Sequence, residues 1–406
     1  MRFVSVSSTR RGAGQAAAEI TRKLHGAFDP KEQSPDLILF FATPEIARHA
    51  ERISETLHET WPQTLVLGVT SAGVFHPTIH AASRPALVAV AAHLPGVVMV
   101  PIRLDLEDFD EAPVCMEQWQ SVLEIVPDPQ LVILLPDPFT TPIVEILESL
   151  RTLAPEVPVI GGQASGANRP GGHVLLIDDH TFRSGVVGVA LAGNIRADVL
   201  VSQGCKPIGD TFTVTKAEGN TVLELSGNPA IEALQEMVAE LPKSERNLLQ
   251  QGLMFGQAIE EPRDTLGRGD FLIRPVVAVD HKEGTISLAG HVHEGQIIRF
   301  HVWDNTLADD LYLLMVPQLV DTAARGGLLF GSWPGRGKDP GVSIRGICKT
   351  LGYPVPMGGF LSSGELGPIR GTNYLHTHTA SLALFRPADE SGPGEDEARR
   401  RGEGLN

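Results

Sequence analysis

The feature that most constrains the fold is a strand, helix, strand pattern that occurs twice, about ninety residues apart. The first copy reads "DLILFF", "TPEIARHAERISETLHETW" and "TLVLGVTSAG", and the second contains "LVILL" and "VPVIGGQASG". Short, continuous apolar runs of this kind are typical of strands buried on both faces. Each copy ends in a glycine-rich turn, so the two segments predict related units.

The helix of each copy is predicted from apolar residues spaced three or four positions apart, which form one stripe of a helix surface. In the first copy Thr43 is a suitable N-cap, and Pro44 stands at the first helical position. The stripes consist of Ile46, Ala50, Ile53 and Leu57 in the first copy and of Ile143, Ile146, Leu150 and Leu153 in the second.

A looser third copy follows in the second half, where "GGLLFGSWPGRGKDP" precedes a predicted helix at "GVSIRGICKTLG" and a strand at "VPMGGFLSSGE". Aligning the last strands of the copies places Gly68, Gly161 and Gly359 together, and likewise Gly73, Gly166 and Gly364. Polar, glycine-rich turns at strand ends are where side chains and backbone amides can contact a ligand.

The segment 257–303 has a different pattern, with alternating runs such as "FLIRPVVAVD" and "QIIRFHVW" separated by short turns, which predicts antiparallel strands. The fold class is therefore α+β, with mixed α/β layers and sheets covered by helices in two related domains. We expect the domains at 1–217 and 218–387. The charged, glycine-rich segment 388–406 has too few apolar residues to offset its ordering entropy and is predicted to be disordered.

Charge and cysteine content narrow the function classes. The 33 basic and 49 acidic residues give a formal charge of −16, which disfavours nucleic acid and anionic membrane surfaces as partners. The three cysteines lie far apart without C-x-x-C spacing, which fits a reducing compartment. No export signal is visible in "MRFVSVSSTRRGAG", so a cytoplasmic location is expected.

Two histidine pairs raise the possibility of a metal site. His376 and His378, and likewise His291 and His293, are two positions apart, so each pair would share a face of a strand. With Glu365 they would supply enough ligands for zinc or iron. The alternative is that they are ordinary strand residues, and we expect no metal or other cofactor.

Cys205 and Arg336 are candidates for direct chemistry. Cys205 stands beside Lys206, and a nearby cation favours the thiolate, so this residue is either a nucleophile or a structural cysteine in a tight turn. Arg336 lies among the glycines of "PGRGKDP", a layout that can present a guanidinium to a carboxylate. The alternative is a solvated turn.

Glu365 and Asn373 lie further along the chain, in the stretch "GELGPIRGTNYLHTHTASLALF". Glu365 can pair with Arg336 or accept a hydrogen bond from the ammonium group of a ligand. Asn373 either closes a turn by bonding its own backbone or contacts a ligand.

These segments together resemble the FIST family, named for F-box and intracellular signal transduction proteins. The resemblance extends from about Asp36 to Phe385 and rests on six blocks of sequence. They are "GVTSAG", "VIGGQAS", "SQGCKPIGDTFTVTKAEGNTVLELSGNPAIEAL", "FLIRPVVAVD", "HVHEGQIIRFHVWD" and "GGFLSSGELGPIRGTNYLHTHTASLALF". The family's closing pattern, L-H-x-x-T-A-S, matches Leu375, His376 and the Thr379–Ser381 stretch and leaves His378 at a variable position.

The resemblance implies a sensory, ligand-binding module of signal transduction proteins, for which amino acids and other small molecules are proposed ligands, and it implies no enzymatic activity. Where the family commonly has F-S-C-x-G-R-G, this chain reads "FGSWPGRG". The cysteine is therefore missing, while Arg336 is kept.

The sequence thus predicts a non-enzymatic protein that binds a small carboxylate or amino-acid-like ligand and has a possible signalling partner. The predicted ligand-binding residues are Arg336, Glu365, Asn373, His376 and Cys205. The alternatives are a metal- or thiol-dependent enzyme and a protein-interaction adaptor without a small ligand.

Overall fold

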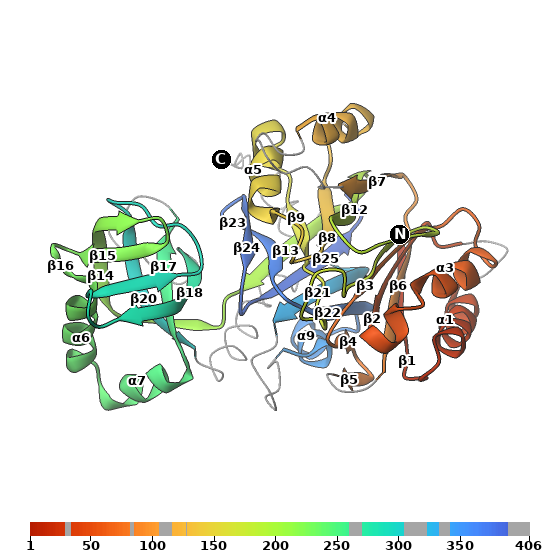
Figure 1. Ribbon diagram of the computed structural model, residues 1–406. Helices are drawn as coiled ribbons and strands as arrows, with labels where there is room; N and C mark the ends of the chain where they lie inside the picture. Colours follow the sequence, from red (N-terminus) through yellow and green to blue (C-terminus); the bar gives the residue numbers. More distant parts are fainter. Residues whose placement is uncertain are drawn as a thin grey trace, which may run out of the picture. The chain divides into compact units, whose positions relative to one another are not determined.

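The computed structural model describes residues 1–28, 34–81, 85–104, 116–126, 128–259, 270–303, 323–332 and 342–388 (Figure 1). These residues form two compact units. Unit 1 contains Met1–Val201 and the described residues of 323–375 and 379–388. Unit 2 contains the described residues of 202–303 and the short stretch His376–His378.

Unit 1 contains three six-stranded sheets, which are built from three repeats of the chain. The first repeat consists of β1 (Arg2–Ser8), α1 (Ala13–Ala27), β2 (Leu37–Ala42), α2 (Pro44–Ala47), α3 (Ala50–His58), β3 (Leu65–Thr70), β4 (Val74–His76), β5 (Ile79–Ala81) and β6 (Leu87–His93). The second consists of β7 (Val97–Leu104), α4 (Met116–Ile125), β8 (Leu131–Pro136), α5 (Ile143–Leu153), β9 (Val159–Gly162), β10 (Leu175–Ile177), β11 (His180–Phe182) and β12 (Val186–Gly193). The third consists of β13 (Arg196–Ser202), β21 (Gly326–Ser332), α9 (Ile344–Leu351), β22 (Met357–Ser362), β23 (Glu365–Ile369), β24 (Thr372–His376) and β25 (Ala380–Arg386).

The three repeats predicted from the sequence are confirmed by the strand register. Each contains one parallel pair, β2 with β3, β8 with β9 and β21 with β22. Gly68 pairs with Phe40, Gly161 with Leu134 and Gly359 with Leu329, so the aligned glycines occupy the same position in each pair. The last strand of each repeat, β6, β12 or β25, runs antiparallel beside β2, β8 or β21.

The hairpin of each repeat belongs to the sheet of another repeat. The hairpin β4–β5 pairs with β22, β10–β11 with β3, and β23–β24 with β9. The exchange is cyclic. The hairpin of the first repeat joins the sheet of the third repeat, the hairpin of the second joins the sheet of the first, and the hairpin of the third joins the sheet of the second. Each sheet is therefore complete only when all three repeats are present.

A shared core explains why the central strands are apolar on both faces. One face of each sheet contributes to a single inner cluster, which includes Phe41, Ile133 and Phe330. The outer face of the first sheet packs against α1 and α3, which lie beside β1 and β6 in Figure 1. The outer face of the second sheet packs against α4 and α5. Strands buried on both sides carry continuous apolar runs, as observed in β2 and β8.

The helical stripes are buried as predicted, with one change in the helix boundaries. Ile46, Ala50, Ile53 and Leu57 are all buried, but the expected single helix is divided into α2 and α3, with a break at Arg48 and His49. Thr43 is the N-cap residue by position, yet its hydroxyl accepts from the backbone N–H of Ala86 instead of capping the helix.

In the third repeat the chain between β13 and β21 contains most of the described part of unit 2, at the place where the first two repeats have α1 and α4. Its strands are β14 (Cys205–Glu218), β15 (Thr221–Leu225), β16 (Asn228–Pro229), β17 (Leu253–Ala258), β18 (Phe271–Asp280), β19 (Thr285–Leu288) and β20 (Ile297–Trp303). They form one seven-stranded sheet that closes on itself, because β14 pairs with both β20 and β15. The helices α6 (Ala230–Glu240) and α7 (Lys243–Leu248) and the 3-10 turn η1 (Leu249–Gln251) complete the unit.

The fold is α+β, with antiparallel and mixed sheets and helices on their outer faces, as the sequence predicts. The antiparallel strands expected within 257–303 are β18, β19 and β20. The division into domains at 1–217 and 218–387 stays a prediction, and the segment 388–406 lies outside the described residues apart from Ala388. Among the described helices, none has the length and apolar character needed to cross a membrane.

Candidate functional site

The glycine loops that follow the three parallel pairs meet at one place in unit 1. We call this place the loop junction and define it as residues 70–73, 163–166 and 361–364. Backbone hydrogen bonds join every pair of loops. The N–H of Ser165 donates to the carbonyl of Thr70 (3.1 Å), and Leu361 donates to Gly73 (2.9 Å). Gln163 donates to Gly364 over 2.8 Å. Gly73, Gly166 and Gly364, which the sequence aligns, therefore lie in loops that contact one another.

Ser165 lies at the centre of the loop junction. Its hydroxyl accepts from the N–H of Ala72 at 2.8 Å and donates to the carbonyl of Leu361, so one side chain connects all three loops. Ala72, Gly166 and Ser363, one residue from each loop, are exposed. The carboxyl ends of parallel strands are a common position for ligand sites in α/β sheets, because loops and free backbone groups gather there.

A carboxylate is buried directly beneath these loops. Glu365 is the first residue of β23, is 0% exposed, and follows the third loop. Its Oε1 accepts from the hydroxyls of Ser332 (2.7 Å) and Ser362 (2.5 Å). Its Oε2 accepts from the hydroxyl of Thr379 at 2.7 Å and from the N–H of the same residue at 3.2 Å. These four bonds satisfy the main acceptor positions of the carboxylate.

Burial raises the pKa of Glu365 to about 7, and the hydrogen bonds from Ser332, Ser362 and Thr379 oppose this increase. The register places Val74 and Leu175 at the same position in the other two hairpins, since Phe75, Leu176 and Leu366 all pair with the aligned glycines. Two repeats thus have an apolar residue where the third has an acid. This difference indicates a role for Glu365 that the fold itself does not require.

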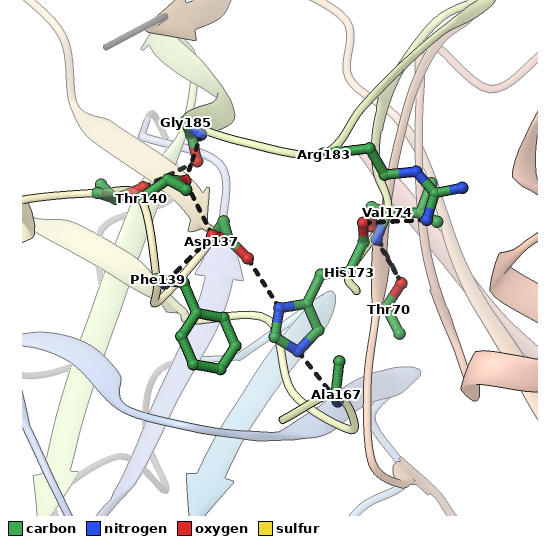
Figure 2. A network of polar contacts seen from close by, with 10 residues as sticks. Thr70, Asp137, Phe139, Thr140, Ala167, His173, Val174, Arg183 and Gly185 are labelled. Atoms are coloured by element: carbon green, nitrogen blue, oxygen red, sulfur yellow. Dashed lines mark hydrogen bonds and ion pairs between the residues drawn. The ribbon is translucent and has the colours of Figure 1, made fainter. Parts of the chain in front are cut away.

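A second buried polar group, the pair of Asp137 and His173, lies in the second repeat (Figure 2). Both side chains are 0% exposed, and Asp137 Oδ1 is 2.7 Å from His173 Nδ1. His173 Nε2 accepts from the N–H of Ala167 at 3.2 Å, so the proton of the ring lies on Nδ1 and is donated to Asp137. Phe139 stacks on the imidazole with ring centroids 5.6 Å apart.

Asp137 also accepts from two groups on the following turn, the hydroxyl of Thr140 (2.8 Å) and the N–H of Phe139 (3.1 Å). Burial alone would raise the pKa of Asp137, but the hydrogen bonds from His173 and Thr140 outweigh it and lower the pKa. This pair was not predicted from the sequence. The available signal was a carboxylate immediately after the buried run "LVILLP", whereas its histidine partner lies 36 residues further on.

Asn373 lies apart from the loop junction. It is on β24, and its side chain accepts from the N–H of Val159 and donates to the carbonyl of Val157, each at 2.8 Å. These contacts are at the start of β9, whereas Glu365 pairs with Gly162 at its end. The amide oxygen and nitrogen of Asn373 therefore hold β24 beside the second repeat, and Asn373 and Glu365 are not brought together.

The remaining predicted residues have different surroundings. His376 is buried at the end of β24. Cys205 is buried at the start of β14 in unit 2, and burial raises the pKa of its thiol to about 12. A thiol with this pKa is protonated at neutral pH, which disfavours a nucleophilic role. Arg336 lies outside the described residues.

The metal hypothesis finds no support in the geometry of the histidine pairs. His376 ends a strand, but His378 lies in the following bend with a φ of 60°, so the two do not alternate along one strand. His291 and His293 are exposed in a turn. Within the described part of the chain, no group of three or more His, Cys, Asp or Glu side chains is arranged to hold a metal ion.

Comparison with protein families gives two matches that together cover most of the chain. The FIST N domain matches residues 36–228, and the FIST C domain matches residues 230–368. The first match includes two of the junction loops and the Asp137–His173 pair, and the second includes the third loop and Glu365.

Curated relatives come from bacteria and an archaeon. An uncharacterized protein of Mycobacterium tuberculosis (strain CDC 1551) is 39% identical over 259 residues, which are 62% of this chain and 67% of the relative. One from Mycobacterium bovis is 40% identical over 262 residues, with the same coverage of 62% and 67%. One from Methanocaldococcus jannaschii is 32% identical over 100 residues, which cover 24% of this chain and 19% of the relative.

Proposed function

Because the chain belongs to the FIST family, whose domains are sensory domains of signal transduction proteins, we propose that it binds a small carboxylate or amino-acid-like ligand at the loop junction. Binding is non-enzymatic in this proposal, and the bound state is passed on to a signalling partner. The cytoplasmic location expected from the sequence is part of the same proposal.

The observation that carries the proposal is the burial of an ionisable carboxylate beneath three loops. Among the described residues, no Lys, Arg or His side chain forms an ion pair with Glu365. A buried, uncompensated carboxylate lowers the stability of the free protein at neutral pH. A ligand ammonium group bound above it offsets that cost, because charges interact strongly where water is excluded.

The roles of the contacting groups follow from this geometry. The four acceptor positions of Glu365 are already used by protein donors. Glu365 therefore supplies a negative charge beneath the site, and the exposed loop residues form the surface that contacts the ligand. In the proposal Arg336, which follows Ser332 in the chain, binds the ligand carboxylate through its guanidinium. Asn373 holds β24 in place, and the proposal assigns no ligand contact to Asn373, His376 or Cys205.

The proposal is tested by a thermal-shift screen of the twenty standard amino acids, succinate and citrate at pH 7.5. A ligand that binds only the folded state raises the melting temperature. Glu365→Gln keeps the shape of the side chain but removes its charge, so it should reduce the shift caused by amino acids. Glu148→Gln, an exposed carboxylate on α5, is the matched control and should leave the shift unchanged.

Two outcomes count against the proposal. If no compound in the panel raises the melting temperature of the wild-type protein, the ligand class is wrong. If a compound raises it equally in wild type, Glu365→Gln and Arg336→Ala, a ligand exists but the site assignment is wrong.

A further inference from the structure

The second repeat contains eight residues that the other two repeats lack. In the first and third repeats Gly73 and Gly364 are followed directly by Val74 and Glu365, the first residues of their hairpins. In the second repeat the residues 167–174 stand between Gly166 and Leu175, which begins β10. We call residues 167–172 the inserted loop. It leaves the loop junction at Gly166.

The Asp137–His173 pair closes the inserted loop at its base. His173 follows the loop, and its Nε2 accepts from the N–H of Ala167, the first residue of the loop. Asp137 fixes the opposite edge of the ring through Nδ1. Within the loop Gly172 donates to the carbonyl of Arg169 at 3.2 Å, and Gly171 has a φ of 72°. The loop is therefore a defined turn with its two ends joined through one imidazole (Figure 2).

The equivalent positions in the other repeats show that the fold does not need this pair. Ala42 in β2, Pro136 in β8 and Gly331 in β21 occupy equivalent positions, because each pairs with the first residue of the last strand of its repeat. The residues that follow them, Thr43, Asp137 and Ser332, are therefore equivalent as well. Thr43 and Ser332 carry a hydroxyl in place of a carboxylate. A buried carboxylate is costly to desolvate, and the hydrogen bonds that it accepts offset this cost without adding much net stability. Its visible effect here is to hold the inserted loop.

The inserted loop presents polar groups beside the junction. Asn168 and Arg169 are exposed at its tip. Phe139, which stacks on His173, is itself 43% exposed, so an aromatic ring edge is available next to the base of the loop. Exposed residues on a loop that the protein holds in one conformation are typical of binding sites, because a fixed loop loses less entropy on binding.

We propose that the inserted loop determines ligand specificity at the loop junction, with Arg169 contacting an anionic group of the ligand and the Asp137–His173 pair acting as its positioning device. This inference rests on the proposed function, since it assigns ligand selection to one element of the same site. The ligand class is a small molecule with a carboxylate or another anionic group.

The role of Arg169 is tested by calorimetric titration of the full-length protein with each of the twenty amino acids, succinate and inorganic phosphate. Arg169→Gln should weaken binding at least tenfold, since a charge-assisted contact is lost, and should leave the melting temperature of the free protein unchanged. Arg151→Gln, at an exposed position on α5, is the matched control and should bind like the wild-type protein.

The positioning role is tested with Asp137→Asn by hydrogen exchange and titration under conditions where urea unfolding shows the variant to be fully folded. The amide of Ala167 should exchange at least tenfold faster than in the wild-type protein, and affinity should fall with it. The exchange rates of amides in β8 and β12, two strands of the same repeat, should be unchanged. A purely structural role would slow or speed all of these amides together and leave the affinity of the folded fraction intact.

The two proposals fail in different ways. If the wild-type protein binds neither an amino acid nor succinate, the proposed function is overturned and this inference with it. If it binds one of these compounds and Arg169→Gln binds that compound equally well, the inference is overturned and the proposed function stands. Rapid exchange of the Ala167 amide in the wild-type protein would contradict the fixed loop irrespective of any ligand.

Discussion

At the scale of single residues, the fold does not require a carboxylate at position 365. Its two counterparts, Val74 and Leu175, fill the same place with apolar side chains. The sequence predicts Glu365 as a partner for Arg336 or for a ligand ammonium group, and its side chain is completely buried. The hydroxyl donors Ser332 and Thr379 could not be predicted, because they come from strands whose register depends on long-range pairing.

We expect the contribution of Glu365 to stability to fall as the pH rises from 5 to 8, while the buried His301, whose pKa is lowered to about 4, contributes in the opposite direction below pH 6.5. The pKa of Glu365 is raised to about 7 in the folded state from 4.5, so the folded state binds the proton more tightly than the unfolded state. The stability that this group contributes is fully present below pH 4.5 and is lost through pH 7. The loss is roughly 3 kcal/mol. Urea unfolding at several pH values measures it.

The contribution of Glu365 is the difference in stability between the wild-type protein and Glu365→Gln at each pH, and Glu365→Gln should be the more stable of the two at pH 8. Its carbonyl oxygen can accept from Thr379, and its amide can donate to the hydroxyl oxygens of Ser332 and Ser362, so the hydrogen bonds are replaced without a buried charge. Glu148→Gln should retain the wild-type profile. An unchanged slope in Glu365→Gln would show that other groups cause the dependence.

At the scale of elements, the parallel pairs explain the repeated glycines. A Cβ on Gly161 would overlap the backbone oxygen of Leu134, and one on Gly359 would overlap that of Leu329. Glycine is required because the adjacent strand leaves no room for a side chain. The repeats, their strands and their helical stripes could be read from the sequence. The break between α2 and α3 could not, because the apolar stripe continues through it.

Gly161→Ala and Gly359→Ala should each destabilise the protein by about 3 kcal/mol or more, since backbone must move to admit the Cβ. Gly26→Ala is the matched control. Gly26 lies in α1, and no atom is within 4 Å of the position that a Cβ would take, so alanine there should stabilise by about 1 kcal/mol through helix propensity. Chemical denaturation of the three variants gives the comparison, and equal stabilities would contradict the close packing of the pairs.

At the scale of the whole molecule, the cyclic exchange of hairpins makes the three repeats depend on one another. Local patterns predict strands and helices, but the sheet that receives a given hairpin is decided by long-range pairing that no local pattern encodes. For the same reason the sequence did not reveal the Asp137–His173 pair. The equivalence of the glycine loops could be read from their repeated spacing, whereas the hydrogen bonds between them could not.

We expect residues 1–195, which hold the first two repeats, to lack cooperative unfolding when expressed alone. The hairpin β4–β5 would lose its partner β22, and β9 would lose β23, leaving apolar strand faces in water. Circular dichroism during urea titration should show a broad transition with a small denaturant dependence. A sharp transition with the dependence expected for a folded protein of this length would contradict the interdependence of the repeats.

Ligand binding at the loop junction can be measured by hydrogen exchange with and without a compound that raises the melting temperature. Binding should slow exchange in peptides that contain residues 70–73, 163–173 and 361–365, with little change in unit 2. Protection confined to peptides of β14–β20, with the three loops unchanged, would contradict binding at the loop junction.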